Sequence, residues 1–133
     1  MTQPRGVVLD TCVVIDLGVL DLGDVLDRRS AVTAITVAEL AYGLDMGDPV
    51  QRAARAERFY GVLNTFHVLP FDTAAAKLYG VLAAMIRQAG RDPRPRRMDL
   101  QIAATAASNG LPLLTRNPDD FAGLEQLVGV LPI

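Results

Sequence analysis

Val7-Val8-Leu9-Asp10-Thr11 is the stretch of this sequence that decides the fold. A short aliphatic run that ends in an acid suits a buried strand, because strands covered on both faces are apolar throughout. The residues from Thr11 to Leu17 are typical of a helix. A strand that leads directly into a helix predicts the first part of a βαβ unit.

The same alternation of strand and helix continues along the chain. Further strands are predicted at residues 31–34, 67–71, 111–115 and 127–131. Further helices are predicted at residues 19–27, 37–44, 50–64, 73–89 and 99–108, with Thr36 and Asp72 as N-caps of the second and fourth. Strands separated by helices at this spacing predict a parallel sheet with helices on both faces. We therefore expect a single α/β domain over residues 1–133.

Composition places this domain among folded proteins. Of its 133 residues 50% are hydrophobic, and the net charge is only −2, which argues against a disordered chain. Cys12 is the single cysteine and cannot form an intramolecular disulfide. No apolar stretch approaches the roughly 20 residues that a membrane helix requires, and the N-terminus has no secretory signal. We expect a soluble, cytoplasmic protein that does not associate with membranes.

Positive charge is concentrated in one stretch. Five arginines lie within eleven residues: Arg87, Arg91, Arg94, Arg96 and Arg97. The two prolines of this stretch predict an exposed loop at residues 91–98. Arginine grips phosphate with a forked geometry, so the stretch permits nucleic-acid binding. A solvated loop between two helices explains it equally well.

Several kinds of active site are excluded by the residues present. No glycine-rich phosphate loop of either common spacing occurs. His67 is the only histidine, so zinc sites and catalytic triads lack a partner base. The haloacid-type pattern needs a second aspartate two positions after Asp10, where Cys12 stands instead. The remaining candidates are carboxylates.

Asp10 and Glu39 are expected at the same edge of the sheet. Asp10 ends the first strand and begins a helix, so it can cap that helix, bind a hard cation at the carboxyl edge of the sheet, or do both. Glu39 lies in the first turn of a helix after a short strand. The apolar stripe of that helix leaves Glu39 toward the far side, where a solvated glutamate is the default.

Asp99 carries its own signal of burial. The stripe that includes Ile102 and Ala103 marks the inward face of the predicted helix, and Asp99 precedes these residues by three and four positions. A carboxylate on the buried side needs a cation, hydrogen-bond donors or an arginine. The alternatives to a cation are the N-terminus of its own helix, Arg96 or Arg97.

Polar residues also follow the strand predicted at residues 111–115. Asn117 as N-cap, Pro118 at the first helical position and two acids after it form a structural motif that needs no functional explanation. That explanation covers Asp119 well. It covers Asp120 less well, because the neighbouring Phe121 predicts that the chain packs against the body here.

Four segments together resemble the motifs of a known family. They are Asp10-Thr11, Ile35-Thr36-Val37-Ala38-Glu39-Leu40, Asp99-Leu100-Gln101-Ile102-Ala103-Ala104-Thr105-Ala106, and Leu114-Thr115-Arg116-Asn117-Pro118-Asp119-Asp120-Phe121. In this order they resemble the PIN-domain ribonucleases, and more narrowly the VapC toxins of VapBC type II toxin–antitoxin systems. The resemblance implies a PIN-like α/β domain on a mostly parallel central sheet. It also implies a toxin that acts as a metal-dependent endoribonuclease.

The resemblance further implies a set of site residues. In the family, the acids that match Asp10, Glu39 and Asp99 bind Mg²⁺ or Mn²⁺, with Asp10 and Asp99 expected as direct ligands. A fourth acid commonly follows the fourth strand, and the candidates for it here are Asp120 and the neutral Asn117. The expected substrate-binding residues are Thr11, Thr115, Arg116, Asn117, Arg96 and Arg97. The implied partners are RNA, a VapB-type antitoxin and a second copy of the chain.

Two other functions stay open at this point. A DNA nuclease or another metal phosphoesterase could use the same sheet edge and the same acids. A catalytically silent, protein-binding PIN-like module could keep the fold without the chemistry.

Overall fold

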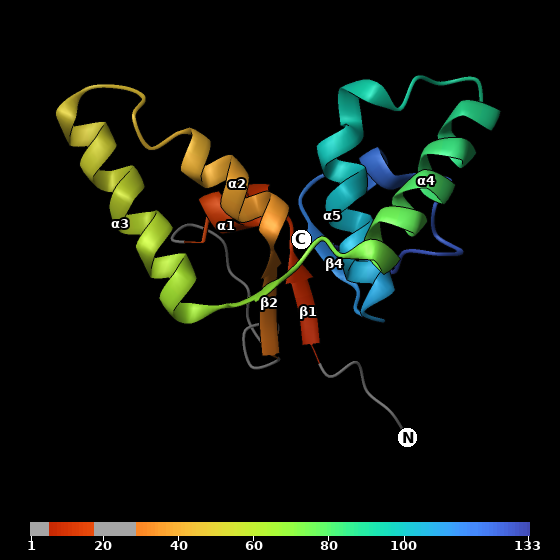
Figure 1. Ribbon diagram of the computed structural model, residues 1–133, viewed down its shortest axis with the longest axis horizontal. Coiled ribbons are helices and arrows are strands. Elements are labelled where there is room, and N and C mark those ends of the chain that lie inside the picture. The colour runs from red at the N-terminus through yellow and green to blue at the C-terminus, as the bar shows by residue number, and fades with distance from the viewer. Residues whose placement is uncertain (1–5, 18–28) are drawn as a thin grey trace.

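A five-stranded parallel sheet forms the centre of the computed structural model, which describes residues 6–17 and 29–133 (Figure 1). Its strands are β1 (Gly6–Leu9), β2 (Arg29–Thr33), β3 (His67–Leu69), β4 (Leu113–Thr115) and β5 (Val130–Pro132). They lie in the order β3-β2-β1-β4-β5, and each neighbouring pair is parallel. The predicted α/β class is confirmed.

Helices cover both faces of this sheet. They are α1 (Thr11–Ile15), α2 (Ala34–Tyr42), α3 (Pro49–Thr65), α4 (Thr73–Gln88) and α5 (Arg97–Ser108), with short 3₁₀ turns η2 (Arg94–Arg96) and η3 (Pro118–Phe121). In Figure 1, α1, α2 and α3 lie to one side of β1 and β2, and α4 and α5 lie to the other. In the described part of the chain, no helix combines the length and the apolar character needed to span a membrane.

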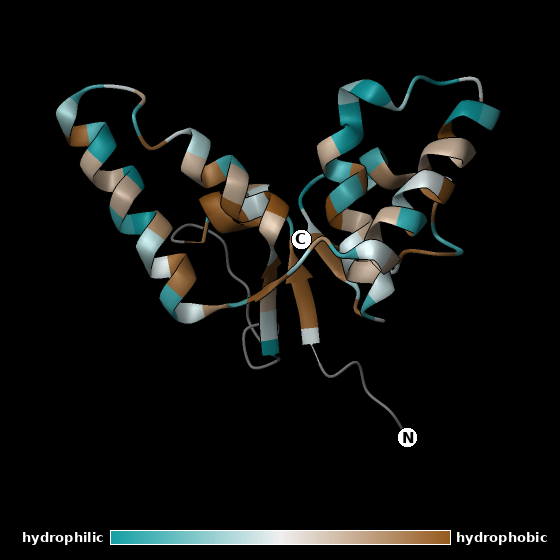
Figure 2. Ribbon diagram, in the orientation of Figure 1, coloured by the Kyte–Doolittle hydropathy of each residue, from teal (hydrophilic) through white to brown (hydrophobic). Residues whose placement is uncertain are grey.

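Strand β1 packs against both helical layers, which explains its unbroken apolar sequence. Val7, Val8 and Leu9 are all fully buried, and β1 is coloured as hydrophobic along most of its length in Figure 2. Because successive side chains of a strand point to opposite faces, Val8 joins the core beneath α4 and α5. Val7 and Leu9 join a second core against α1 and α3. The first strand therefore links the two halves of the interior.

Polar side chains determine where the helices begin. Asp72 caps α4, because its side chain accepts a hydrogen bond of 3.0 Å from the backbone N–H of Ala75. The prediction of Thr36 as N-cap of α2 is wrong by one turn. Thr33 is the cap, and its hydroxyl accepts a bond of 3.2 Å from the Thr36 N–H. Helix α2 starts there because β2 ends at Thr33 and no loop separates the two elements.

The last two strands are shorter than the sequence pattern predicts. Residue 111 stays outside β4 because its N–H donates to the Ala106 carbonyl at the end of α5. The N–H groups of Leu127 and Val128 donate back to the Leu124 carbonyl, so β5 begins only at Val130. Backbone groups committed to these turns cannot join the ladder of the sheet.

The predicted loop at residues 91–98 also differs in part. It contains the 3₁₀ turn η2, and α5 begins at Arg97, two residues before the predicted start. The arginines of this stretch are nevertheless exposed, as expected. The helix predicted at residues 19–27 lies outside the described residues.

Two neighbouring positions of α4 provide a test of the packing. Leu82 is fully buried in the core, whereas Val81 is 48% exposed. We expect Leu82→Ala to lower the free energy of unfolding by about 2–5 kcal/mol, since it removes buried methyl groups and leaves a cavity. Val81→Ala should change it by less than about 0.5 kcal/mol. Urea denaturation measures both, and equal losses in the two variants would contradict this assignment of the core face.

Candidate active site

The order of the strands predicts a crevice at the carboxyl end of β1. From β1 the chain passes to β2 and β3 on one side and returns to β4 on the other. Ligands of open α/β sheets bind at such a switch point, outside the carboxyl ends of the strands. Three polar residues end the central strands or directly follow them here: Asp10 after β1, Thr33 in β2 and Thr115 in β4. All three are buried.

Asp10 is held in place by both neighbouring elements. Its Oδ1 accepts a hydrogen bond of 2.9 Å from the Thr11 N–H, which caps α1. Its Oδ2 accepts one of 2.8 Å from the Thr115 hydroxyl. The thiol of Cys12 lies 3.6 Å from the same Oδ2. The N-cap interpretation is confirmed, and the capping carboxylate also stands at the crevice.

Glu39 is connected to Asp10 through Thr11. The Thr11 hydroxyl donates to Glu39 Oε1 at 2.9 Å and lies 2.9 Å from the Thr36 hydroxyl. Burial raises the pKa of Glu39, the Thr11 hydrogen bond opposes that shift, and the charge of Asp10 adds to it. The expectation of a solvated Glu39 is wrong. The apolar stripe of α2 predicts which side of the helix faces the core. It does not predict that α1 packs against the side that carries Glu39.

Asp99 faces the other acids from the first turn of α5. Burial and the charges of Asp10, Asp120 and Glu39 together raise its pKa from 3.8 to about 6, while Arg96 opposes the shift. Four carboxylates from four separate segments therefore share one electrostatic environment. The inward position predicted for Asp99 agrees with the burial of Leu100, Ile102 and Ala103 beside it.

The segment after β4 contributes Asp120 to the site, but the predicted capping role of the Asn117 side chain is wrong. Asn117 occupies the cap position of η3, yet its side chain makes no capping hydrogen bond. Its backbone N–H donates to the Thr115 hydroxyl at 3.1 Å. Asp120 forms an ion pair with Arg96, which is one of the two arginines considered as partners of Asp99. Asp119 is exposed.

Most of the expected phosphate-binding arginines have partners within the chain. Arg116 pairs with Asp16 at the end of α1, a contact that no sequence pattern indicated because the two residues are 100 positions apart. Arg94 pairs with Asp92 at 3.0 Å. Arg97 lies exposed at the start of α5. The basic stretch is therefore less available to a ligand than its composition predicts.

The donor set has the chemistry of a hard-cation site without a closed cage. Four carboxylates supply oxygen ligands, which Mg²⁺ and similar cations prefer, and a cation would relieve the repulsion that raises the pKa of Asp99. Within residues 6–17 and 29–133, no group of three or more His, Cys, Asp or Glu side chains is arranged to hold a metal ion. The residues fit a divalent cation in kind and in charge.

Repulsion among these acids predicts a pH-dependent stability. The pKa of Asp99 is higher in the fold than its ordinary 3.8, so the metal-free protein loses stability as the pH rises from about 4 to about 6. Near neutral pH, with a chelator present, the free energy of unfolding of Asp99→Asn should therefore be about 1 kcal/mol higher than that of the unchanged protein. This value is reduced to allow for the partial exposure of Asp99.

Urea denaturation at several pH values measures this difference. The gain should vanish below the ordinary pKa, where Asp99 is protonated in both states. Asp119→Asn, which removes an exposed charge, is the matched control and should show no such gain. A stability difference that does not vary with pH would contradict the assigned repulsion.

Comparisons with known proteins agree with this geometry. Residues 7–126 match the family model of the PIN domain. The chain is 37% identical to ribonuclease VapC5 of Mycobacterium tuberculosis, over 97% of this chain and 95% of that protein. It is 32% identical to the tRNA(fMet)-specific endonuclease VapC of Shigella flexneri, over 70% of this chain and 67% of that one.

A solved structure gives the same result. The crystal structure of VapBC-5 from Mycobacterium tuberculosis, a member of the VapBC family of toxin–antitoxin systems, superimposes with a TM-score of 0.76 at 36% identity and covers 98% of both chains. The match extends over the whole sheet and both helical layers. This chain belongs to the PIN-domain family and, within it, to the VapC endoribonucleases of toxin–antitoxin systems.

Proposed function

We propose that this VapC-type toxin hydrolyses RNA phosphodiester bonds with Mg²⁺ or Mn²⁺ held between Asp10 and Asp99. VapC nucleases with a PIN domain generally depend on a divalent metal. The observation that carries the proposal is the gathering of four carboxylates from the end of β1, α2, α5 and η3, whose charges, together with burial, raise the pKa of Asp99 to about 6. Such a cluster is unfavourable unless a cation neutralises it, and repulsion between the carboxylates therefore favours cation binding.

Each acid has a distinct position and hence a distinct proposed role. Asp10 and Asp99 hold the cation from the end of β1 and from the start of α5. When bound, the cation polarises the scissile phosphate and lowers the pKa of an attacking water. Glu39, whose pKa is raised by burial, is suited to accept a proton from that water. Asp120 completes the negative environment.

The hydroxyls of Thr11 and Thr115 act through these acids. Thr11 donates to Glu39 and Thr115 donates to Asp10, so each fixes the direction of one carboxylate. The residues proposed to contact RNA directly are exposed around the crevice: Asn117, Arg97 and Arg116. Arg96 joins them when it leaves Asp120.

The partners follow from relatives that are crystallised as toxin–antitoxin pairs, as VapBC-5 is. We propose a VapB-type antitoxin that inserts a segment into the acidic crevice and neutralises it. A homodimer, a cytoplasmic location and a single domain over residues 1–133 stay predictions from the sequence.

Removal of one metal ligand tests the activity. We expect Asp10→Asn and Asp99→Asn each to lower kcat/KM for RNA cleavage at least about 100-fold, and chelation of the metal to abolish it. Asp119→Asn changes an exposed acid of the same type and should cleave normally. Cleavage is measured on labelled RNA and DNA with Mg²⁺ and with Mn²⁺.

Two results would overturn the proposal. Cleavage of DNA alone would identify a DNA nuclease. Growth inhibition that persists in cells expressing Asp10→Asn without an antitoxin would show that toxicity comes from protein binding and not from RNA hydrolysis.

The buried hydroxyl of Thr115 provides a further test. Thr115→Val keeps the shape of the side chain but removes the hydrogen bond to Asp10 Oδ2, so metal affinity should fall about 10–100-fold. Thr115→Ser retains the hydroxyl and should restore most of that loss. Isothermal titration with Mn²⁺ measures the affinity, and circular dichroism checks the fold. Equal affinities for the valine and serine variants would remove Thr115 from the site.

A further inference from the structure

A second, basic feature borders the acidic site. A cavity of about 140 Å³ lies between α1, α2 and α3. Thr11 and Glu39 line it from the acidic side, and Arg55 and Arg58 line it from α3. Thr11 and Glu39, which are joined by a hydrogen bond, therefore belong both to the acidic site and to the wall of this cavity.

Arg55 and Arg58 differ from Arg94, Arg96 and Arg116, each of which has an acidic partner. They lie three positions apart on α3, which places them on one face of the helix. Among the residues that the structure describes, neither forms an ion pair, whereas Arg94, Arg96 and Arg116 all do. Within the described part of the chain, both guanidinium groups therefore keep their hydrogen-bond donors free of a carboxylate.

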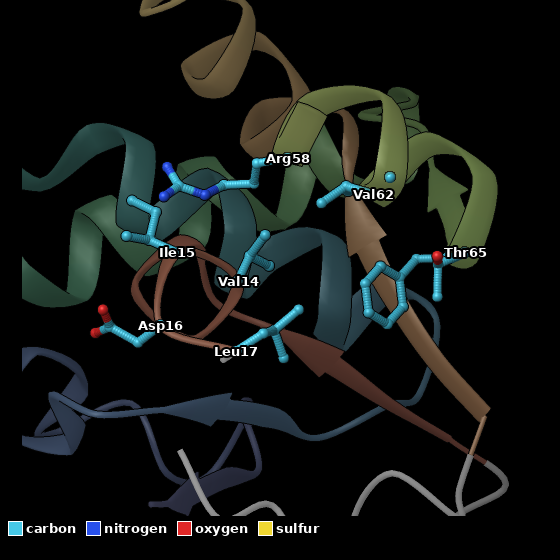
Figure 3. Close-up of a pocket in the computed structure, with 9 residues that line it drawn as sticks. Val14, Ile15, Asp16, Leu17, Arg58, Val62 and Thr65 are labelled. Atoms are coloured by element: carbon cyan, nitrogen blue, oxygen red, sulfur yellow. The ribbon is translucent and has the colours of Figure 1, made fainter. Parts of the chain in front are cut away.

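The residues around Arg55 and Arg58 leave space for their long side chains. Gly43 ends α2, and a Cβ added there would stand 3.2 Å from Arg55 Nη1, so the guanidinium passes close over a residue without a side chain. In Figure 3 the side chain of Arg58 extends from α3 toward Ile15 of α1. Ile15 and Arg58 both line the cavity. Both arginines thus contribute to the wall of the cavity that Thr11 and Glu39 also line.

The charges in the cavity favour an anion. Two guanidinium groups outnumber the single carboxylate of Glu39 among its lining residues. Guanidinium groups bind phosphate oxygens in forked pairs. Because Glu39 and Thr11 belong to both features, an anion held here would lie next to the metal site.

We propose that Arg55 and Arg58 form a phosphate-binding subsite that holds the RNA backbone beside the scissile phosphate. The inference rests on the proposed function, since it takes RNA as the ligand of the neighbouring site. It places the basic wall of the substrate groove on α3, on the opposite side of the acids from the arginine-rich stretch at residues 87–97.

Binding of RNA without cleavage tests the subsite. A fluorescein-labelled oligouridylate is titrated with Asp10→Asn protein in Mg²⁺ at several salt concentrations, and anisotropy gives the affinity. Adding Arg55→Ala and Arg58→Ala should weaken binding about 10-fold or more. Each should also make the slope of log affinity against log salt shallower by about 0.7, the value for one lost contact to a single strand.

The control variant is Lys77→Ala, which removes one exposed positive charge from α4. It should leave both the affinity and the slope unchanged, and Arg55→Lys should retain part of the binding. An unchanged slope in the double arginine variant, or an equal loss with Lys77→Ala, would overturn the subsite. Cleavage by the unchanged protein is assayed separately, so a failure of the proposed activity is distinguished from a failure of the subsite.

Discussion

The hydrogen bond of 2.8 Å from the Thr115 hydroxyl to Asp10 Oδ2 is the contact on which the rest of the site depends. It joins the ends of β1 and β4, the two neighbouring strands between which the chain reverses its direction across the sheet. The other oxygen of Asp10 caps α1, so a single carboxylate fixes the strand edge, the following helix and one wall of the crevice. Thr11, the first residue of that helix, donates a hydrogen bond from its hydroxyl to Glu39 and so fixes the position of this second carboxylate. A buried acid is normally a cost, and here its hydrogen bonds offset that cost while leaving its charge at the crevice.

The fold also keeps acids together that would otherwise separate. Burial and the charges of Asp10, Asp120 and Glu39 raise the pKa of Asp99 to about 6. A raised pKa of this kind corresponds to a free energy that opposes folding when Asp99 is ionised. The apolar packing of both helical layers supplies the opposing stability, since β1 is fully buried between them. Concentrated, unfavourable charge of this kind is typical of sites where function rather than stability has selected the residues.

The sequence predicted the parts of this structure that depend on local pattern. Continuous apolar strands, the Asp72 cap and the inward face of α5 each follow from periodicity or capping within a few residues, and so does the capping role of Asp10. Glu39 could not be placed in this way, because its partner Thr11 is 28 positions away and the packing of α1 beside α2 is a tertiary fact. The pairing of Arg116 with Asp16, and of Arg96 with Asp120, was hidden for the same reason. The predicted ends of β4 and β5 were wrong where a backbone N–H donates to a carbonyl within a turn. The pattern of apolar residues does not indicate such hydrogen bonds.

Under the proposed function, charge pairing determines which basic residues of a chain of net charge −2 can contact RNA. The arginines of the basic stretch stand out in the sequence, but an arginine already paired with an aspartate contributes little to the field felt by a phosphate. Arg94 and Arg96 are paired in this way, whereas no described residue forms an ion pair with Arg55 or Arg58. Because α3 packs against α2, it brings these two guanidinium groups to the cavity that Glu39 and Thr11 also line. Tertiary packing of this kind, which no local sequence pattern reveals, thus favours α3 as a basic wall of the proposed groove, in addition to the exposed Arg97 at the start of α5.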